Sequence, residues 1–450
     1  LPWRGRPPTP RTRPEIALDP IVGFSIFMVA LLLFLATGTP VAVATGLVGI
    51  IGVYLYLPHG ALTQLASIAY AQSASFVLVV VPLFVMMGEA LAATTIGRDL
   101  FTAAQIWLKR LPGSLAIGTV VACAIFGGPC GSSPVTAATI GALSVPEMIK
   151  SGYNARLAFG TTAAGGTLGI LIPPSVPMIL YGVITETSIG KLFMAGVVPG
   201  LMMAVLLSLT VVIWVLRNPG AAPALKERPP WRERGRATLQ VGPILLLSLF
   251  VIGSIYSGIA TPTEAGAVGA AGAILFAAIM GKLRVALLRR SLESTVHTTA
   301  MFMLLLVGGL FSSFVLTRLG VPQGMSEFLT GLDVPGWVVI VLINVLLVVL
   351  GMFLDPMSIL VIVVPIFLKT VIGLGYDPIW FGVIVTIQIE IAAITPPVGF
   401  NLFVLKNVMP GSDFKDVVKG SVLFVIPLLL GIALLMLFPG IALWLPRQVG

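Results

Sequence analysis

Apolar residues gather into long continuous runs along this chain, and polar residues are confined to the segments between them. The runs are 21–36, 41–57, 74–95, 197–216, 239–260, 265–281, 296–317, 337–354, 358–373 and 420–446. As helices they suit a hydrocarbon core of ~30 Å, whereas membrane β-barrel strands would alternate apolar and polar positions. The pattern predicts an all-α polytopic membrane protein.

Composition and charge support this prediction. Soluble domains average about 25% charged residues, but this chain has 10%, and 57% of it is hydrophobic. The net charge of +9 is concentrated most clearly in RNPGAAPALKERPPWRERGR at 217–236, and we expect no nucleic-acid partner. Because positively charged loops stay in the cytoplasm, we expect 217–238 to be a cytosolic linker.

The chain opens with a basic, proline-rich tail at 1–19. No small-residue cleavage site followed by soluble sequence comes after it, so 21–36 is expected to remain as a membrane span. Cys123 and Cys130 lie near a membrane segment and suggest neither a disulfide framework nor a transition-metal site.

Short sequence anchors recur in the same order in both halves of the chain. They pair TPVAVATG at 39–46 with TPTEAGAVG at 261–269, LPG at 111–113 with VPG at 334–336, GYN at 152–154 with GYD at 375–377, and LIPPS at 171–175 with ITPPV at 394–398. The first pair is 222 residues apart and the others 223. We therefore expect transmembrane repeats at 20–216 and 239–446. Duplicated halves are typical of secondary transporters, although duplication can also build a channel or an inert scaffold.

The repeat places a proline pair at equivalent positions in two apolar stretches, Pro173-Pro174 and Pro396-Pro397. Proline lacks an N–H and clashes with the preceding helical turn, so we expect broken helices near 165–182 and 380–405. Non-helical backbone survives at membrane depth where it lines a cavity or is buried in protein. Its free carbonyls suit Na⁺, and half-helix N-termini attract anions. The alternative is a pair of kinks packed against neighbouring helices.

A second matched feature predicts re-entrant hairpins near 114–147 and 337–373. The first has the small-residue tip GGPCGSSP, and at the repeat offset its Ser132 corresponds to Asp355. Hydroxyls and a carboxylate are hard donors suited to a small cation. Ser132 and Ser133 could instead be helix-packing serines, and Asp355 could be a helix N-cap.

Other ionisable residues interrupt the apolar runs. Glu89 and Glu390 need a partner or a proton, Glu264 stands where it would offset a helix dipole, and Arg318 could snorkel to the interface. The sequence has no G-x-x-x-x-G-K-[ST] loop, no hydrolase motif and no TVGYG filter. These patterns favour gradient-driven transport by a protein that is not an enzyme.

Several stretches resemble the large permease subunit of tripartite ATP-independent periplasmic (TRAP) transporters, DctM-like. They are GSSPVTAATIGALSVPEM at 131–148, GGTLGILIPPSVPMILYGVITETSIGKLFMAGVVPG at 165–200, SGIATPTEAGAVGA at 257–270, GMFLDPMSIL at 351–360 and DPIWFGVIVTIQIEIAAITPPVGFNLFVLK at 377–406. The resemblance covers about 20–446.

The resemblance implies two inverted repeats, each with a re-entrant hairpin and an interrupted helix, in an elevator-type fold of the ion-transporter superfamily. It also implies Na⁺-coupled uptake, without an organic cofactor, of a C4-dicarboxylate, sugar acid or similar carboxylate across the bacterial inner membrane. The implied partners are a periplasmic binding protein, a small four-helix membrane subunit and membrane lipids.

Carried onto this sequence, the resemblance implies sites at both tips. The sodium residues would be Ser132, Ser133, Pro134, Gly165, Gly166 and Thr167 in the first half, and Asp355, Thr395, Pro396 and Gly399 in the second. The substrate residues would be Pro174, Ser175, Asn401 and Arg318. The stretch from Thr395 to Asn401 is expected to serve the second site. A passive channel subunit and the permease of an ATP-driven importer remain the alternative functions.

Overall fold

The computed structural model describes residues 19–58, 60–223 and 229–448, and every regular element in these ranges is helical. The predicted tail at 1–19 lies outside this part of the chain, except for Asp19. Six described helices are long and apolar enough to cross a membrane, or up to eight spans if each bent helix pair counts as one. The fold is therefore that of an all-α polytopic membrane protein.

The first half runs from α1 to the short 3-10 turn η2. Its elements are α1 (Pro20–Ala36), α2 (Val41–Tyr56), α3 (Ala61–Ser73), η1 (Phe76–Val79), α4 (Val80–Ala92), α5 (Ile96–Leu108), α6 (Ser114–Cys130), α7 (Ser133–Lys150), α8 (Ala155–Leu171), α9 (Val176–Thr185), α10 (Ile189–Arg217) and η2 (Pro219–Ala221).

The second half runs from α11 to α22. Its elements are α11 (Trp231–Tyr256), α12 (Pro262–Ile279), α13 (Val285–Arg318), α14 (Val321–Thr330), α15 (Gly336–Gly351), α16 (Pro356–Ser358), the π-helical turn η3 (Ile359–Val363), α17 (Val364–Gly373), α18 (Pro378–Ile394), α19 (Phe400–Val408), α20 (Phe414–Leu423), α21 (Val425–Leu437) and α22 (Gly440–Gln448).

The two halves repeat the same order of helices. A shift of 223 positions carries the bounds of α8 onto those of α18, and the bounds of α7 onto the segment from α16 to α17. The packing repeats with the partners exchanged: α2 packs on α13, and its counterpart α12 packs on α4. The duplication read from four short anchors therefore extends through the helical architecture.

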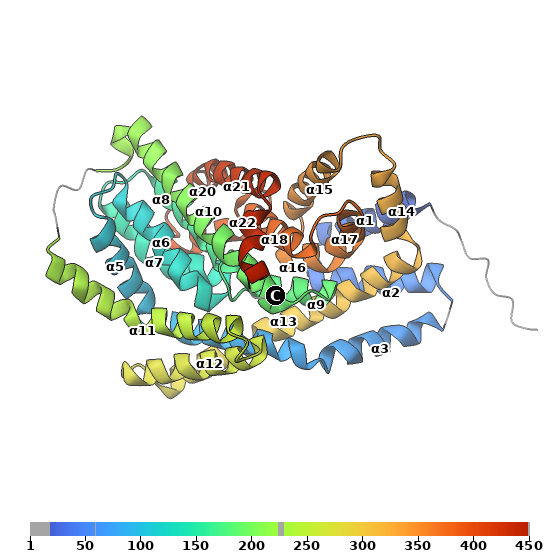
Figure 1. Cartoon of the computed structure of the whole chain (residues 1–450), viewed down its shortest axis with the longest axis horizontal. Helices are drawn as coiled ribbons and strands as arrows, with labels where there is room; N and C mark the ends of the chain where they lie inside the picture. Colours follow the sequence, from blue (N-terminus) through green and yellow to red (C-terminus); the bar gives the residue numbers. More distant parts are fainter. Residues whose placement is uncertain (1–18, 59, 224–228, 449–450) are drawn as a thin grey trace, which may run out of the picture.

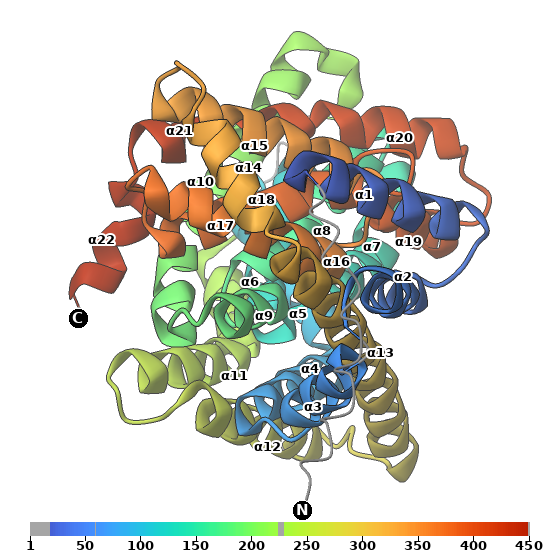
Figure 2. The same cartoon turned by 90° about the vertical axis from the view of Figure 1, so that its right-hand side faces the viewer.

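The helices fall into an outer layer and an inner group. In Figure 1, α2, α3, α11, α12 and α13 run along the lower edge, while the hairpins and broken helices lie above them. Figure 2 shows α3, α4, α11 and α12 gathered on the same side. The inner group is more heavily buried: nearly every residue of α8 and α18 is buried.

Both predicted hairpins form from helices joined by short tips. The first joins α6 to α7, and its tip begins at Gly131, whose φ of +61° is the left-handed conformation that ends many helices. Pro134 then falls in the first turn of α7, where its missing N–H is harmless. The second joins α15 to α16, and the π-helical turn η3 follows.

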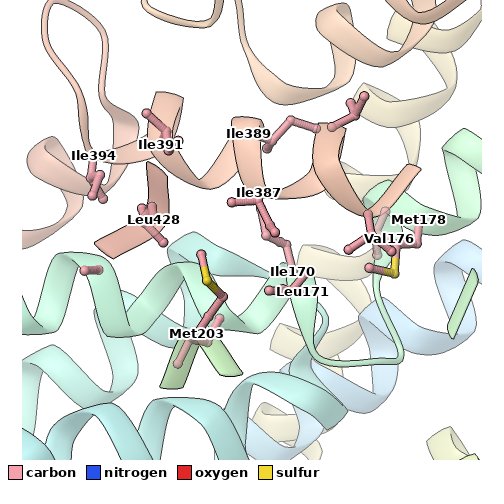
Figure 3. Close-up of a cluster of buried hydrophobic side chains, with 14 of the residues drawn as sticks. Ile170, Leu171, Val176, Met178, Met203, Ile387, Ile389, Ile391, Ile394 and Leu428 are labelled. Atoms are coloured by element: carbon pink, nitrogen blue, oxygen red, sulfur yellow. The ribbon is translucent and has the colours of Figure 1, made fainter. Parts of the chain in front are cut away.

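The two proline pairs break their helices as predicted. The chain bends by 43° between α8 and α9, and α18 ends at Ile394 before α19 begins at Phe400. Both Pro-Pro peptide bonds are cis. A close-packed cluster joins the two broken helices: Ile170 and Leu171 at the end of α8 face Ile387 of α18, with Met203 of α10 beside them (Figure 3).

The linker between the halves is shorter than the predicted 217–238, because α11 already begins at Trp231. The Trp231 ring stands edge-on to Trp107 of α5, with ring centroids 6.3 Å apart. The Arg234 guanidinium lies 5.5 Å from the centroid of Trp107 and 5.0 Å from that of Trp231. These cation–π contacts hold the first turn of α11 against α5.

Helices α8 and α20 approach so closely that only glycine fits between them. A methyl group at Gly160 would overlap the Gly420 carbonyl, and one at Gly420 would overlap the Arg156 carbonyl. Small residues of this kind let helix backbones pack against each other in membranes.

We expect Gly160→Val to destabilise the protein by about 1–3 kcal/mol or more through overpacking. Thermal unfolding in detergent will measure this loss of stability.

The matched control is Gly253→Val in α11, where the added carbon has no atom within 4 Å beyond its own helix backbone and its chain neighbours. This variant should unfold close to the wild-type temperature. Equal losses in the two variants would show that the α8–α20 contact does not limit stability.

Candidate functional site

The tip of the first hairpin lies against the break in the first interrupted helix. A methyl group at Gly131 would lie 3.0 Å from the Pro174 carbonyl oxygen. One at Gly169 would lie 3.0 Å from the Ser132 carbonyl oxygen and 2.7 Å from Thr136 Oγ1. The predicted tip and the predicted broken helix therefore converge.

The glycines of α8 continue this contact along the arm of the hairpin. A methyl group at Gly166 would lie 2.6 Å from Ala137 Cβ of α7, and one at Gly165 would lie 3.3 Å from Cys123 Sγ of α6. Thr167 is buried, and its hydroxyl donates to the Ala164 carbonyl at 2.7 Å. These positions bring the α8 backbone against both arms of the hairpin, and the Thr167 hydroxyl is already bonded within its own helix.

Polar groups partly repair the first break. Because Pro173 and Pro174 have no N–H, the carbonyls of Gly169 and Ile170 lose their helical donors. Ser175 Oγ donates to the Ile170 carbonyl and accepts from the Met178 N–H at 3.4 Å as the N-cap of α9. The hydroxyl predicted to bind substrate is thus bonded to the backbone of the break.

The tip serines differ in their roles. The Ser132 carbonyl accepts from the Thr136 hydroxyl at 2.8 Å and from the Thr136 N–H at 3.1 Å. Ser133 is fully buried, and its Oγ accepts from Asn401 Nδ2 at 2.8 Å. Ser133 therefore presents its hydroxyl toward the other half of the protein, and Pro134 follows it in the first turn of α7.

Asn401 joins the second half to the first hairpin. It is fully buried on α19, and its Nδ2 also donates to the Ala163 carbonyl of α8 at 3.2 Å. Its Oδ1 has no hydrogen-bond partner among the described residues. From the sequence, we expect Asn401 to serve the second site together with Asp355. In the structure the side chain of Asn401 instead bonds Ser133 of the first hairpin.

The halves exchange their second half-helices. Helix α19 packs on α7 of the first hairpin, and Leu405 Cδ2 of α19 would lie 2.8 Å from a methyl group at Gly141. The equivalent helix α9 packs on α16, η3 and α17 of the second hairpin. Each hairpin thus contacts its own broken helix and a half-helix from the other repeat.

The tip of the second hairpin also lies at its own break. The Val398 N–H donates to the Met352 carbonyl at 3.2 Å, and a methyl group at Gly351 would lie 2.7 Å from Ala392 Cβ. Gly399 is the N-cap of α19, and its φ of +42° is a backbone conformation that favours glycine.

Asp355, the acidic residue of the second tip, is the N-cap of α16. This helix-capping role is the alternative to cation binding that the sequence allows. Asp355 Oδ2 accepts from the Met357 N–H at 3.0 Å, and its Oδ1 accepts from the Ser358 hydroxyl. The Thr395 hydroxyl donates to the Ile391 carbonyl at 2.6 Å. Thr395 and Pro396 are half-buried, whereas Pro173 and Pro174 are buried, so the second break is more open than the first.

Two charged candidates lie on the outer layer. Arg318 ends α13, where its Nη2 donates to Gln64 Oε1 of α3 at 3.3 Å and its guanidinium lies 5.3 Å from the Phe314 ring centroid. Glu264 and Thr261 form a reciprocal capping box at the start of α12. The structure brings neither residue into the contacts described for the tips.

The structure adds buried polar residues that the sequence-based site left out. Glu390 of α18 is fully buried, and neither carboxylate oxygen has a partner among the described residues. On the same helix, Gln388 Nε2 donates to Asn344 Oδ1 of α15 at 2.6 Å. In the sequence, an ionisable residue at membrane depth is the signal that points to a functional site. That signal identifies Glu390 but does not give it a role.

The comparisons with known proteins agree with this architecture. The family described as "Tripartite ATP-independent periplasmic transporter, DctM component" matches residues 28–441. The C4-dicarboxylate TRAP transporter large permease protein DctM of Pseudomonas aeruginosa is 35% identical over 408 residues, covering 90% of this chain and 94% of that protein.

Relatives named for other substrates are similar at nearly the same level. The sialic acid TRAP transporter large permease SiaM of Vibrio cholerae is 33% identical and covers 83% of this chain and 87% of its own length. The ectoine TRAP transporter large permease TeaC of Halomonas elongata is 31% identical. The match covers 94% of this chain and 98% of that protein.

A solved structure shares the fold. The Alcanivorax borkumensis YdaH transporter, described as having an unusual topology, matches with a TM-score of 0.59 and 16% identity over 95% of this chain and 100% of that one. Together the matched family and the relatives show that this chain belongs to the DctM family, the large permease component of TRAP transporters, as a multi-pass protein of the inner membrane.

Proposed function

We propose that this chain uses a sodium gradient to take up a small organic anion, such as a C4-dicarboxylate or a sugar acid. The family implies two partners, a small membrane subunit and a periplasmic binding protein. The binding protein would deliver the anion to the permease. The observation that carries the proposal is the buried contact of Asn401 of α19 with Ser133, beside the first tip, and with the Ala163 carbonyl of α8.

The chemistry of this meeting point suits a small hard cation. Ser133 Oγ, the Ala163 carbonyl and the unpartnered Asn401 Oδ1 are neutral oxygens at a buried site. In transporters built from repeats, carbonyls of unwound backbone and helix ends coordinate Na⁺. Here the Gly169 carbonyl, which lost its helical donor at the break, is of that kind, whereas Ala163 lies within α8. Bringing a cation here would satisfy the Asn401 oxygen, which otherwise costs the desolvation of a buried acceptor.

The half-helices offer complementary sites for an anion. Helices α9 and α19 begin directly after the two breaks, with Ser175 and Gly399 as their N-caps. A helix N-terminus carries partial positive charge and free N–H groups, which favour a carboxylate. Cation and anion would then bind at adjacent parts of one broken helix, so that each favours the other electrostatically.

Movement of the inner group against the outer layer would carry the site across the membrane. Only the short helices α5 and α14 lead from α4 and α13 into the two hairpins. The connecting helices α5 and α14 have equivalent positions in the two repeats. An elevator-type motion is therefore part of the proposal.

Uptake by proteoliposomes tests the proposal directly. The permease is reconstituted with its small membrane subunit and its periplasmic binding protein. The labelled substrate is the carboxylate that most stabilises that binding protein in a thermal-shift screen. Uptake should require an inward sodium gradient. Uptake that ignores sodium would refute the coupling, ATP-dependent uptake would favour an importer, and single-channel conductance would favour a channel.

Asn401→Ala should reduce sodium-driven uptake about ten-fold or more. The substitution removes the amide that bonds Ser133 and Ala163, and an unmade buried hydrogen bond costs about 1–3 kcal/mol. The sodium concentration for half-maximal uptake should rise, which initial-rate measurements over a sodium series will show.

Asn407→Ala provides the matched control on the same helix, because Asn407 is exposed. It should transport like the wild type. If Asn401→Ala kept both its rate and its sodium dependence, Asn401 would have no place in the cation site.

Asp355→Asn separates a charge that binds sodium from a carboxylate that only caps a helix. Asparagine caps helices about as well as aspartate, so the melting temperature should change little while uptake falls and needs more sodium. The control, Asp413→Asn, alters an exposed cap of the same kind, in which Asp413 accepts from the Lys415 N–H at 2.9 Å. Unchanged uptake by Asp355→Asn would leave Asp355 as a cap alone.

A further inference from the structure

A large cavity lies away from the hairpin tips, where α8 begins, α10 ends and α20 meets α21. Its volume is about 960 Å³, at the upper end of the range for small-molecule sites. None of its lining residues belongs to the tips or breaks described above. The transport proposal therefore gives this cavity no role.

Three cationic side chains line the cavity, each from a different helix: Arg156 of α8, Arg217 of α10 and Lys419 of α20. Arg156 is partly neutralised, because its Nε donates to Asp416 Oδ1 at 2.8 Å. Three cations and this one neighbouring carboxylate leave a local charge of +2. Arginine and lysine in such an arrangement favour phosphate groups.

Apolar side chains form much of the remaining wall and reach the exposed surface of the protein, beside the polar Asn154, Thr210 and Asn218. Ile213 is 50% exposed, Leu423 38% and Ile426 64%, and all three line the cavity. Trp214 lies between the cations and this apolar wall along α10. Tryptophan is enriched at the level of lipid headgroups, where one side of the ring is apolar and the other wet.

The position of the cavity places it at the cytoplasmic surface. Its lining includes Arg217 to Ala221, where the chain leaves α10 and enters the basic linker. Basic segments beside membrane spans remain in the cytoplasm. Basic pockets between helices on that side attract the headgroups of anionic lipids.

We propose that this cavity is a binding site for an anionic phospholipid, with Arg217, Lys419 and the remaining donors of Arg156 holding its phosphate. The acyl chains would lie along Ile213, Leu423 and Ile426. A free phosphate would use the cations but not this apolar wall, so the membrane-facing opening favours the lipid. The lipid would bridge the first half, through α8 and α10, to α20 of the second.

Fluorescence quenching tests the proposal on the full chain in detergent. Phosphatidylglycerol with brominated acyl chains should quench Trp214 saturably, and the quenched component should be absent in Trp214→Phe. Brominated phosphatidylcholine should quench this component little. Removing both free cations in Arg217→Gln/Lys419→Gln should raise the half-quenching concentration roughly ten- to thirty-fold, because each basic residue contributes to headgroup attraction.

Two matched double variants test whether a weaker quenching reflects the cavity itself or only a general loss of positive charge or of the fold. Lys282→Gln/Arg284→Gln removes two exposed cations that do not line the cavity and should bind like the wild type. Arg217→Lys/Lys419→Arg keeps the charge and should retain binding. Equal quenching by the two brominated lipids, or full competition by millimolar inorganic phosphate, would overturn the lipid assignment.

Discussion

The structure depends on one constraint: backbone groups that leave a helix inside a membrane need partners within the protein. Pro173-Pro174 and Pro396-Pro397 each remove two donors in the middle of an apolar segment. At each break the tip of the hairpin from the same half covers the exposed backbone, with Gly131 against the Pro174 carbonyl and Met352 accepting from the Val398 N–H. Each hairpin tip therefore packs on the break of its own half, and at the second break it also accepts a backbone hydrogen bond.

This mutual covering explains why the halves interlock. A broken helix sends its second part away from the first, so α9 reaches the hairpin of the second half and α19 that of the first. The exchange makes a single inner group from two repeats. Asn401 provides one of the polar contacts within it, because its amide bonds both Ser133 and the Ala163 carbonyl. Contacts that cross between the repeats therefore hold this group together.

The sequence predicted the backbone better than the side-chain partners. Proline pairs, glycine-rich tips and a constant offset are local signals, and they located the breaks, the hairpins and the repeat. The bond between Asn401 and Ser133 joins residues 268 positions apart, and no local pattern encodes it. The cap made by Asp355 was recognised as an alternative because capping is local, whereas the length of the linker was overestimated because the Trp107–Trp231–Arg234 contact is tertiary.

The repeated backbone carries unequal chemistry at its two tips. At the repeat offset the counterpart of Asn401 is Met178, and both are fully buried, but a thioether cannot donate to a hairpin as an amide does. The counterpart of Ser133 is Pro356, and that of Thr167 is Glu390. The first tip thus offers neutral oxygens in a closed site, while the second half contributes the carboxylates of Asp355 and Glu390 around a more open break. Under the proposed sodium coupling, cations bound at the two tips would differ in affinity and in their access to water. The pseudo-symmetry of the fold would then not extend to the energetics of coupling.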